Sequence, residues 1–135
     1  MDILEGLKFH HIGYAVKSID ETANFYVSKG WTLSEETIDP IQNTKIAFLK
    51  RDGFPLMELV APVDETSPIV KTLDKVGVST YHVCYGVNNL EDVVKQLRKE
   101  KFLPLFKPVP ANALDNKRIC YLYNAIVGLI ELVEN

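Results

Sequence analysis

Hydrophobic and polar positions follow the same course twice along the chain. A stretch in which apolar residues alternate with small or polar ones begins at His11 and again at His82, 71 residues later. An amphipathic segment of helical period follows each stretch. Two more strand-like stretches, IAFL from Ile46 and LMELV from Leu56, recur 73 residues further on as ICYL and LIELV. A repeat of this length indicates a duplicated module, so we predict an α+β fold of two paired βαβββ modules.

Turn and capping residues give bounds to these elements. In module one, about residues 8–62, Ser18 and Glu21 form a capping-box pattern before the helix, and Gly30 ends it. Its strands are expected at 9–16, 32–38, 44–50 and 55–61, with a turn at 51–53. Module two, about residues 80–134, is expected to have a strand at 80–87, a helix at 90–100 capped by Asn89, and strands near Leu105 and at 117–123 and 127–133.

The segment between the modules also carries structural signals. Ser67 followed by Pro68 is typical of a helix start, and Gly77 is a helix stop, so residues 64–78 predict a linker helix. Residues 108–116 are polar and contain prolines, which predicts a loop over one end of a site. Because 135 residues suit one compact unit built from two halves, we expect a single domain over residues 1–135.

Composition narrows the classes of function. With 47% hydrophobic residues and a net charge of −3, the chain lacks the basic excess of a nucleic-acid-binding surface. It contains no run of 18 apolar residues, and its N-terminus lacks the pattern of a secretion signal, so no membrane association is expected. Cys84 and Cys120 lie in apolar strands and are interpreted as buried thiols without a chemical role, which favours a cytoplasmic location.

The two histidines occupy strand faces that are cleared of bulky groups. By alternation, His11 shares its face with Gly13 and Ala15, while the large side chains take the other face. His82 stands among small residues in the same way. Such histidines face open space, as a ligand-binding surface requires. His10 has no histidine counterpart and is expected on the opposite face, so we interpret it as structural.

Each module ends in a strand with a glutamate among apolar residues. Glu58 and Glu131 sit at equivalent repeat positions, and a desolvated carboxylate costs several kcal/mol unless a partner compensates it. Two imidazoles and two carboxylates suit a divalent transition metal such as Co, Zn, Ni, Mn or Fe, with positions left open for a substrate. The sequence therefore predicts a metal site formed by His11, Glu58, His82 and Glu131.

The motifs that contain these residues resemble the vicinal oxygen chelate (glyoxalase-fold) superfamily. The resemblance runs from about Phe9 to Glu134, and within the superfamily the chain resembles the methylmalonyl-CoA epimerases. The segments that carry it are HIGYAVKSIDETANFY, ELVAPVDETSPIVKTLDK, YHVCYGVNNLEDVVKQL and GLIELVEN. This resemblance implies a cupped mixed sheet around one metal ion and assigns the same four ligands.

The resemblance also implies a chemistry. An enzyme of this type is an isomerase that abstracts the proton alpha to a thioester carbonyl through a metal-stabilised enolate, and acts on an acyl-CoA. Glu131 is the expected base, and the group on the opposite face is expected to be the carboxylate of Glu58 or a shifted Lys45, unless the reaction is not an epimerisation. Lys45 stands where some epimerases have another carboxylate, and the glycine-rich segment of the second module is replaced here by residues 112–117. Substrate-binding residues are unknown, with Lys45, Lys117 and Arg118 as candidates.

Two other functions remain open from the sequence. One is a glyoxalase I-type lactoylglutathione lyase that acts on a thiol hemithioacetal, although its usual DPDGYxIEL-type ending is absent. The other is a non-catalytic small-molecule-binding protein of the same fold.

We expect the modules to pair within one chain, and the apolar residues Ile38, Ile41, Leu105 and Phe106 predict a homodimer.

Overall fold

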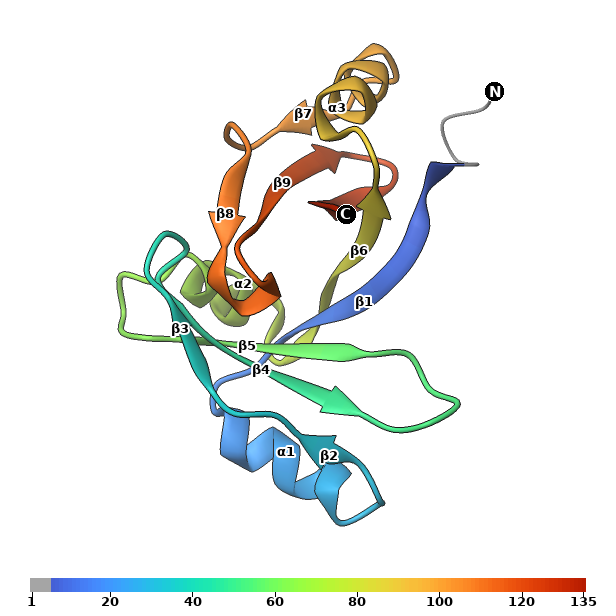
Figure 1. Ribbon diagram of the computed structural model, residues 1–135. Coiled ribbons are helices and arrows are strands. Elements are labelled where there is room, and N and C mark those ends of the chain that lie inside the picture. The colour runs from blue at the N-terminus through green and yellow to red at the C-terminus, as the bar shows by residue number, and fades with distance from the viewer. Residues whose placement is uncertain (1–5) are drawn as a thin grey trace. The chain divides into compact units, whose positions relative to one another are not determined.

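The computed structural model describes residues 6–135 and contains two compact units (Figure 1). One unit is His11–Tyr81, and the other combines His82–Asn135 with residues 6–10. The division falls between the two predicted modules. Each unit is built on a mixed sheet whose apolar face packs against a helix.

The first unit follows the predicted βαβββ order. Its strands pair in the order β2-β4-β5-β1, with β1 parallel to β5, the other pairs antiparallel, and β3 on β4. Its elements are β1 (Lys8–Ala15), α1 (Ile19–Val27), β2 (Thr32–Leu33), β3 (Thr37–Asp39), β4 (Thr44–Lys50) and β5 (Met57–Pro62).

Helix α1 begins where the capping residues predicted it. Ser18 has an extended backbone, and its hydroxyl oxygen accepts a hydrogen bond from the backbone N–H of Glu21 at 3.2 Å. The helix ends at Val27, and Gly30 takes the left-handed φ of 95° that a residue with a Cβ rarely adopts. The face of α1 that contains Ile19 and Ala23 packs on a buried cluster with Val16, Ala47, Leu49, Met57, Leu59 and Ala61.

The predicted strand at 32–38 is wrong in one respect, because two short strands, β2 and β3, take its place. The exposed residues Ser34, Glu35 and Glu36 separate them. Ser34 stays attached to β4 through its hydroxyl oxygen, which accepts a hydrogen bond from the Phe48 N–H at 2.8 Å. A side chain thus replaces part of the ladder, and the strand is interrupted.

The linker forms helix α2 (Ile69–Val76), and Gly77 ends it with a φ of 74°. The prediction that Ser67 caps this helix is wrong, since Pro68 is the N-cap residue and makes no side-chain cap hydrogen bond. The buried Ser67 hydroxyl instead donates to the Asn43 carbonyl at 2.6 Å and accepts from the Val63 N–H at 2.9 Å. Ser67 therefore ties the linker to the turn before β4.

The second unit repeats the order and adds one 3-10 turn. Its strands pair as β6-β10-β9-β7, with β6 parallel to β10 and β8 on β9. Asn89 caps α3 as predicted, accepting from the Asp92 N–H at 3.1 Å. The elements are β6 (Ser79–Val87), α3 (Leu90–Lys99), β7 (Leu103–Pro104), β8 (Val109–Ala111), the 3-10 turn η2 (Asn112–Leu114), β9 (Lys117–Asn124) and β10 (Gly128–Glu134).

The prediction of a loop at 108–116 is wrong, because this segment contains β8 and η2. Pro110 lies opposite Arg118, and β8 pairs only with β9 among the strands at residues 6–135. A proline is tolerated on such an edge strand because its missing N–H faces away from the ladder. The prolines therefore did not prevent a strand.

Surface exposure agrees with part of the homodimer prediction. Ile38, Ile41 and Leu105 are exposed, whereas Phe106 is half-buried. The homodimer itself stays a prediction.

Among residues 6–135, no helix has the length and apolar character needed to cross a membrane.

Candidate metal centre

In the first unit, His11 and Glu58 meet on one face of adjacent parallel strands. The register pairs Gly13 of β1 with Glu58 of β5, and residues paired in this way point to the same face. His11 lies two residues before Gly13 and shares that face. Its Nε2 is 3.4 Å from Oε1 of Glu58, and the two side chains are 0% and 4% exposed.

In the second unit, His82 and Glu131 form the equivalent pair. The register pairs Cys84 of β6 with Glu131 of β10, again two residues beyond the histidine. Nε2 of His82 is 3.2 Å from Oε1 of Glu131, and both side chains are buried. The repeat in the sequence is therefore a repeat in geometry, because each module places an imidazole against a carboxylate at the same step of a parallel strand pair.

An aromatic ring accompanies each pair at the corresponding position. Phe48 lies opposite Glu58 in the β4–β5 ladder, and its ring meets His11 edge-on, with centroids 6.1 Å apart. Tyr121 lies opposite Glu131 in the β9–β10 ladder and meets His82 in the same way at 5.2 Å. These rings restrict the orientation of the imidazoles.

The chemistry of the two pairs fits a divalent metal. Both glutamates are buried, Glu58 at 3% and Glu131 at 2% exposure, and buried carboxylates require compensating positive charge. Neutral imidazole nitrogens and carboxylate oxygens are the donors that divalent transition metals bind in proteins. Each pair therefore offers one imidazole and one carboxylate that could bind such an ion, and the identity of the metal is left open by these donors.

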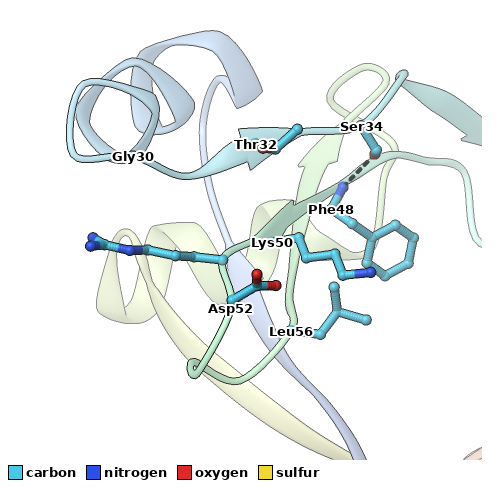
Figure 2. Close-up of a pocket in the computed structure, with 8 residues that line it drawn as sticks. Gly30, Thr32, Ser34, Phe48, Lys50, Asp52 and Leu56 are labelled. Carbon is cyan, nitrogen blue, oxygen red and sulfur yellow. Dashed lines mark hydrogen bonds between the residues drawn. The ribbon is translucent and has the colours of Figure 1, made fainter.

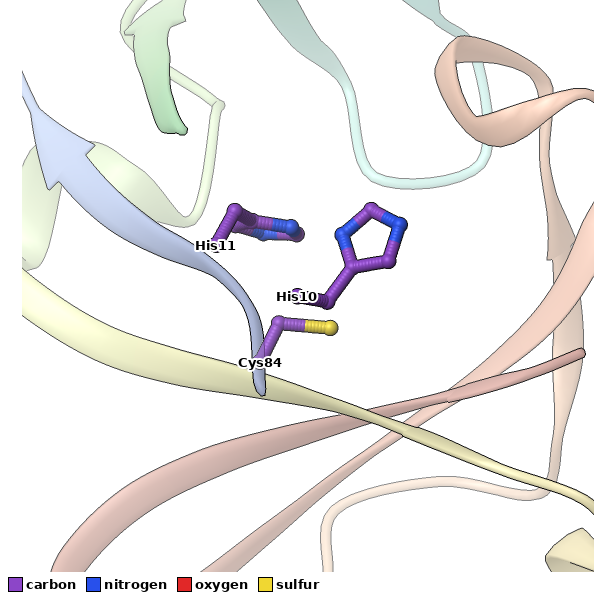
Figure 3. Close-up of side chains that lie close together, drawn as sticks. All are labelled: His10, His11 and Cys84. Carbon is purple, nitrogen blue, oxygen red and sulfur yellow. The ribbon is translucent and has the colours of Figure 1, made fainter. Parts of the chain in front are cut away.

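Cys84 adds a thiol to the second unit's ligand face. It is fully buried, shares the face of His82 and lies directly opposite Glu131. A ring nitrogen of His10 lies within 4.8 Å of the Cys84 sulfur (Figure 3). The prediction that His10 points away from the ligand face is therefore wrong, because its ring reaches the side on which Cys84 lies.

The three candidate substrate-binding residues differ in their placement. Lys45 pairs with Ala61, which belongs to the cluster packed on α1, so its side chain does not share the face of Glu58. Lys117 is exposed at the start of β9, on the strand face of Tyr121. Neither contacts the His–Glu pair of its own unit through any ion pair found among residues 6–135.

Arg118 is engaged elsewhere. Its guanidinium donates to Glu134 at 2.6 and 3.0 Å and to Glu91 of α3 at 3.0 Å, and Nη1 lies 2.6 Å from Glu91. Hydrogen bonds from Arg118 hold the pKa of Glu134 and that of Glu91 below the ordinary range of a glutamate. Arg118 thus links α3 to β10 on the face opposite Glu131.

Burial raises the pKa of the Cys120 thiol, which agrees with an unreactive core cysteine.

Sequence reasoning missed a cavity in the first unit. A space of about 500 Å³ is lined by residues of β2, β4 and the β4–β5 turn (Figure 2). Its lining includes Phe48, Lys50 and Leu56. The available signal was the spacing of Phe48 and Lys50, two residues apart on one strand and therefore on one face.

Comparison with known proteins agrees with this geometry. Residues 10–121 match the profile of the Glyoxalase/Bleomycin resistance protein/Dioxygenase superfamily. The mitochondrial methylmalonyl-CoA epimerase of Homo sapiens is 30% identical over 129 residues, covering 93% of this chain and 72% of the human protein.

Solved structures agree as well. The methylmalonyl-CoA epimerase of Mycobacterium tuberculosis aligns with a TM-score of 0.83 and 31% identity over 94% of this chain and 87% of that one. A Streptomyces coelicolor methylmalonyl-CoA epimerase variant in complex with 2-nitronate-propionyl-CoA aligns with a TM-score of 0.80 and 25% identity over 95% and 96%.

The fold is accordingly the glyoxalase fold, an α+β arrangement of βαβββ modules. The likeness to the epimerases extends over nearly the full chain, and each module contributes one buried His–Glu pair. The chain belongs to the Glyoxalase/Bleomycin resistance protein/Dioxygenase superfamily.

Proposed function

We propose that this protein is a metal-dependent epimerase that acts on a CoA thioester of the methylmalonyl type. The observation that carries the proposal is the doubled, buried His–Glu pair in a chain similar to methylmalonyl-CoA epimerases over nearly its full length. In this proposal His11, Glu58, His82 and Glu131 bind one divalent ion. The ion would act as a Lewis acid toward the negative charge that develops on a carbonyl oxygen.

Two carboxylates serve the proton transfers in this proposal. Glu131 accepts the proton alpha to the thioester carbonyl, and burial keeps its carboxylate out of bulk water. Inversion requires a donor on the other side of the same carbon. Lys45 lies on the face packed toward α1, so Glu58, which shares the ligand face of its module, is the better candidate for this role.

Exchange of the alpha proton tests this function directly. The metal-loaded protein is incubated in D₂O with methylmalonyl-CoA, and in a separate reaction with the hemithioacetal of glutathione. We expect deuterium to enter methylmalonyl-CoA, and no product to form from the hemithioacetal. Lactoyl-thioester formation without deuterium exchange would identify a glyoxalase instead, and binding without either reaction would identify a non-catalytic binding protein.

Glu131→Gln tests the assignment of the base. Loss of a general base lowers such a rate by about 10²- to 10⁴-fold. The matched control is Glu134→Gln, which removes a carboxylate from the same strand but on the face bound to Arg118. Exchange at the wild-type rate in Glu131→Gln would refute the assignment, as would an equal loss in both variants.

A further inference from the structure

The cavity of the first unit lies between β2 and the β4–β5 hairpin. It measures about 500 Å³, within the range of small-molecule sites in proteins. Figure 2 shows the side chains of Lys50, Phe48 and Leu56 directed into the same region. The lining residues are Gly30, Thr32, Ser34, Phe48, Lys50, Arg51, Asp52 and Leu56.

One residue of the cavity lining, Phe48, also lies beside the candidate metal ligands of the same unit. Phe48, which lines the cavity, is the ladder partner of Glu58 and touches the ring of His11 edge-on. Lys50 follows two residues later on the same face, about 7 Å further along the strand. The face therefore presents a carboxylate and imidazole, then apolar groups, then a cation.

The charged groups of the cavity differ in their freedom to bind a ligand. Lys50 is exposed and forms no ion pair among residues 6–135. Arg51 is held in place, since its Nη1 donates to the Lys29 carbonyl at 2.7 Å and its guanidinium lies 5.1 Å from the Phe54 ring centre. With Asp52 as the acid of the lining, the cations exceed the acids by one.

We propose that this cavity receives the carrier arm of the CoA thioester, with Lys50 pairing with its phosphate groups. This inference rests on the proposed function. The order of groups along the face matches a substrate that reacts at one end, continues as a partly apolar arm with amide groups, and is anionic at the other end. The wall formed by Phe48 and Leu56 suits the arm, and the free ammonium of Lys50 suits a phosphate.

Binding of free CoA tests the site without any turnover. Trp31 is the single tryptophan of the chain and neighbours the lining residues Gly30 and Thr32 in the sequence, so a change in its fluorescence is the first readout of binding. We expect Lys50→Gln to raise the Kd for CoA about three- to tenfold, as expected for loss of a charge-assisted contact at an exposed site. The control Lys75→Gln removes an equally exposed charge from α2 and is expected to leave the Kd unchanged. Calorimetry gives the Kd independently of fluorescence.

Kinetics with a shortened substrate locate the contact. The methylmalonyl thioester of pantetheine has the same acyl group and arm but no phosphates. Lys50→Gln should lower kcat/KM for the CoA thioester about three- to tenfold and leave kcat/KM for the pantetheine thioester unchanged. Equal losses on both thioesters, or a Kd for CoA that Lys50→Gln does not alter, would overturn the site.

Failure of the proposed epimerase function and failure of the proposed CoA site give different results. CoA binding that depends on Lys50, without proton exchange, would support the cavity while refuting the epimerase. Proton exchange together with a Kd for CoA that is identical in wild type and Lys50→Gln would support the epimerase while refuting the cavity. Thermal melting of Lys50→Gln in the same buffer must coincide with wild type, which an exposed side chain predicts.

Discussion

Replacing the buried glutamates by glutamine should stabilise the metal-free protein while abolishing stabilisation by metal. Glu58 and Glu131 are almost fully buried, each against an imidazole 3.2 to 3.4 Å away. Glutamine keeps the shape of glutamate and removes the charge. Because desolvating a charge costs several kcal/mol, we expect a gain of about 1 to 3 kcal/mol for each variant.

The gain can be converted into a melting temperature. For a chain of 135 residues, about 2.1 cal/mol/K of unfolding entropy per residue makes 1 kcal/mol equal to roughly 3 to 4 °C. Glu58→Gln and Glu131→Gln should therefore each melt about 3 to 10 °C above wild type in chelator. A metal at 100 times its Kd should stabilise wild type by about 2.7 kcal/mol, and neither variant should respond at that concentration.

Differential scanning calorimetry with chelator and with each divalent metal provides both measurements. Glu36→Gln is the control, since it removes an exposed carboxylate and should shift melting by no more than about 2 °C. Variants that melt below wild type in chelator would show that the His–Glu pairs stabilise the fold by themselves. That result would refute the reasoning that the carboxylates are retained for a cation.

Four further predictions concern the same chain. Arg118→Gln should lower the free energy of unfolding by an amount that is constant near neutral pH and shrinks in acid. The lowered pKa of Glu134 stabilises the fold above the unfolded pKa of glutamate, and this contribution is lost as pH falls through the folded pKa. Urea denaturation at several pH values measures the difference between variant and wild type, and a difference independent of pH would contradict the prediction. Leu132→Ala, at a fully buried position in the second unit, should cost about 2 to 5 kcal/mol in urea denaturation, and a loss below 1 kcal/mol would show that this core is loosely packed. Protein purified without chelator should contain one divalent metal per chain, and metal analysis should find none in His11→Ala or His82→Ala. Mixing these two variants should restore no activity if the modules pair within one chain. Recovered activity would show exchange of modules between chains.

Strand alternation made much of the candidate site predictable. A one-residue slip would move every side chain of a strand to the other face, so a histidine among small residues and a glutamate among apolar ones left one sensible orientation for each strand. The structure places His11 with Glu58 and His82 with Glu131 as that orientation requires. Alternation does not describe contacts between residues distant in sequence, so it leaves open which strands pair within each unit.

The errors share a physical cause, which is competition from distant partners. Ser67 before a proline has the local pattern of a helix cap, yet its hydroxyl is bound by Val63 and by Asn43, which is 24 residues away. Pro110 suggested a loop because a central strand excludes proline, whereas β8 lies at an edge. Lys45 was a candidate because of its place in the sequence, and only the register with Ala61 shows which face it occupies.

The rings beside the two histidines differ by one oxygen atom, since Phe48 accompanies His11 and Tyr121 accompanies His82. A duplicated protein with identical halves would present the same surroundings to both sides of a substrate carbon. The epimerisation that we propose needs one group that removes a proton on one side of the carbon and another group that returns a proton on the other side. A phenol in one half and a plain ring in the other make the halves chemically distinguishable while the ligands remain a matched set. Together with Cys84 opposite Glu131, where the first unit has Gly13 opposite Glu58, this difference gives the two carboxylates different surroundings without altering a proposed metal ligand.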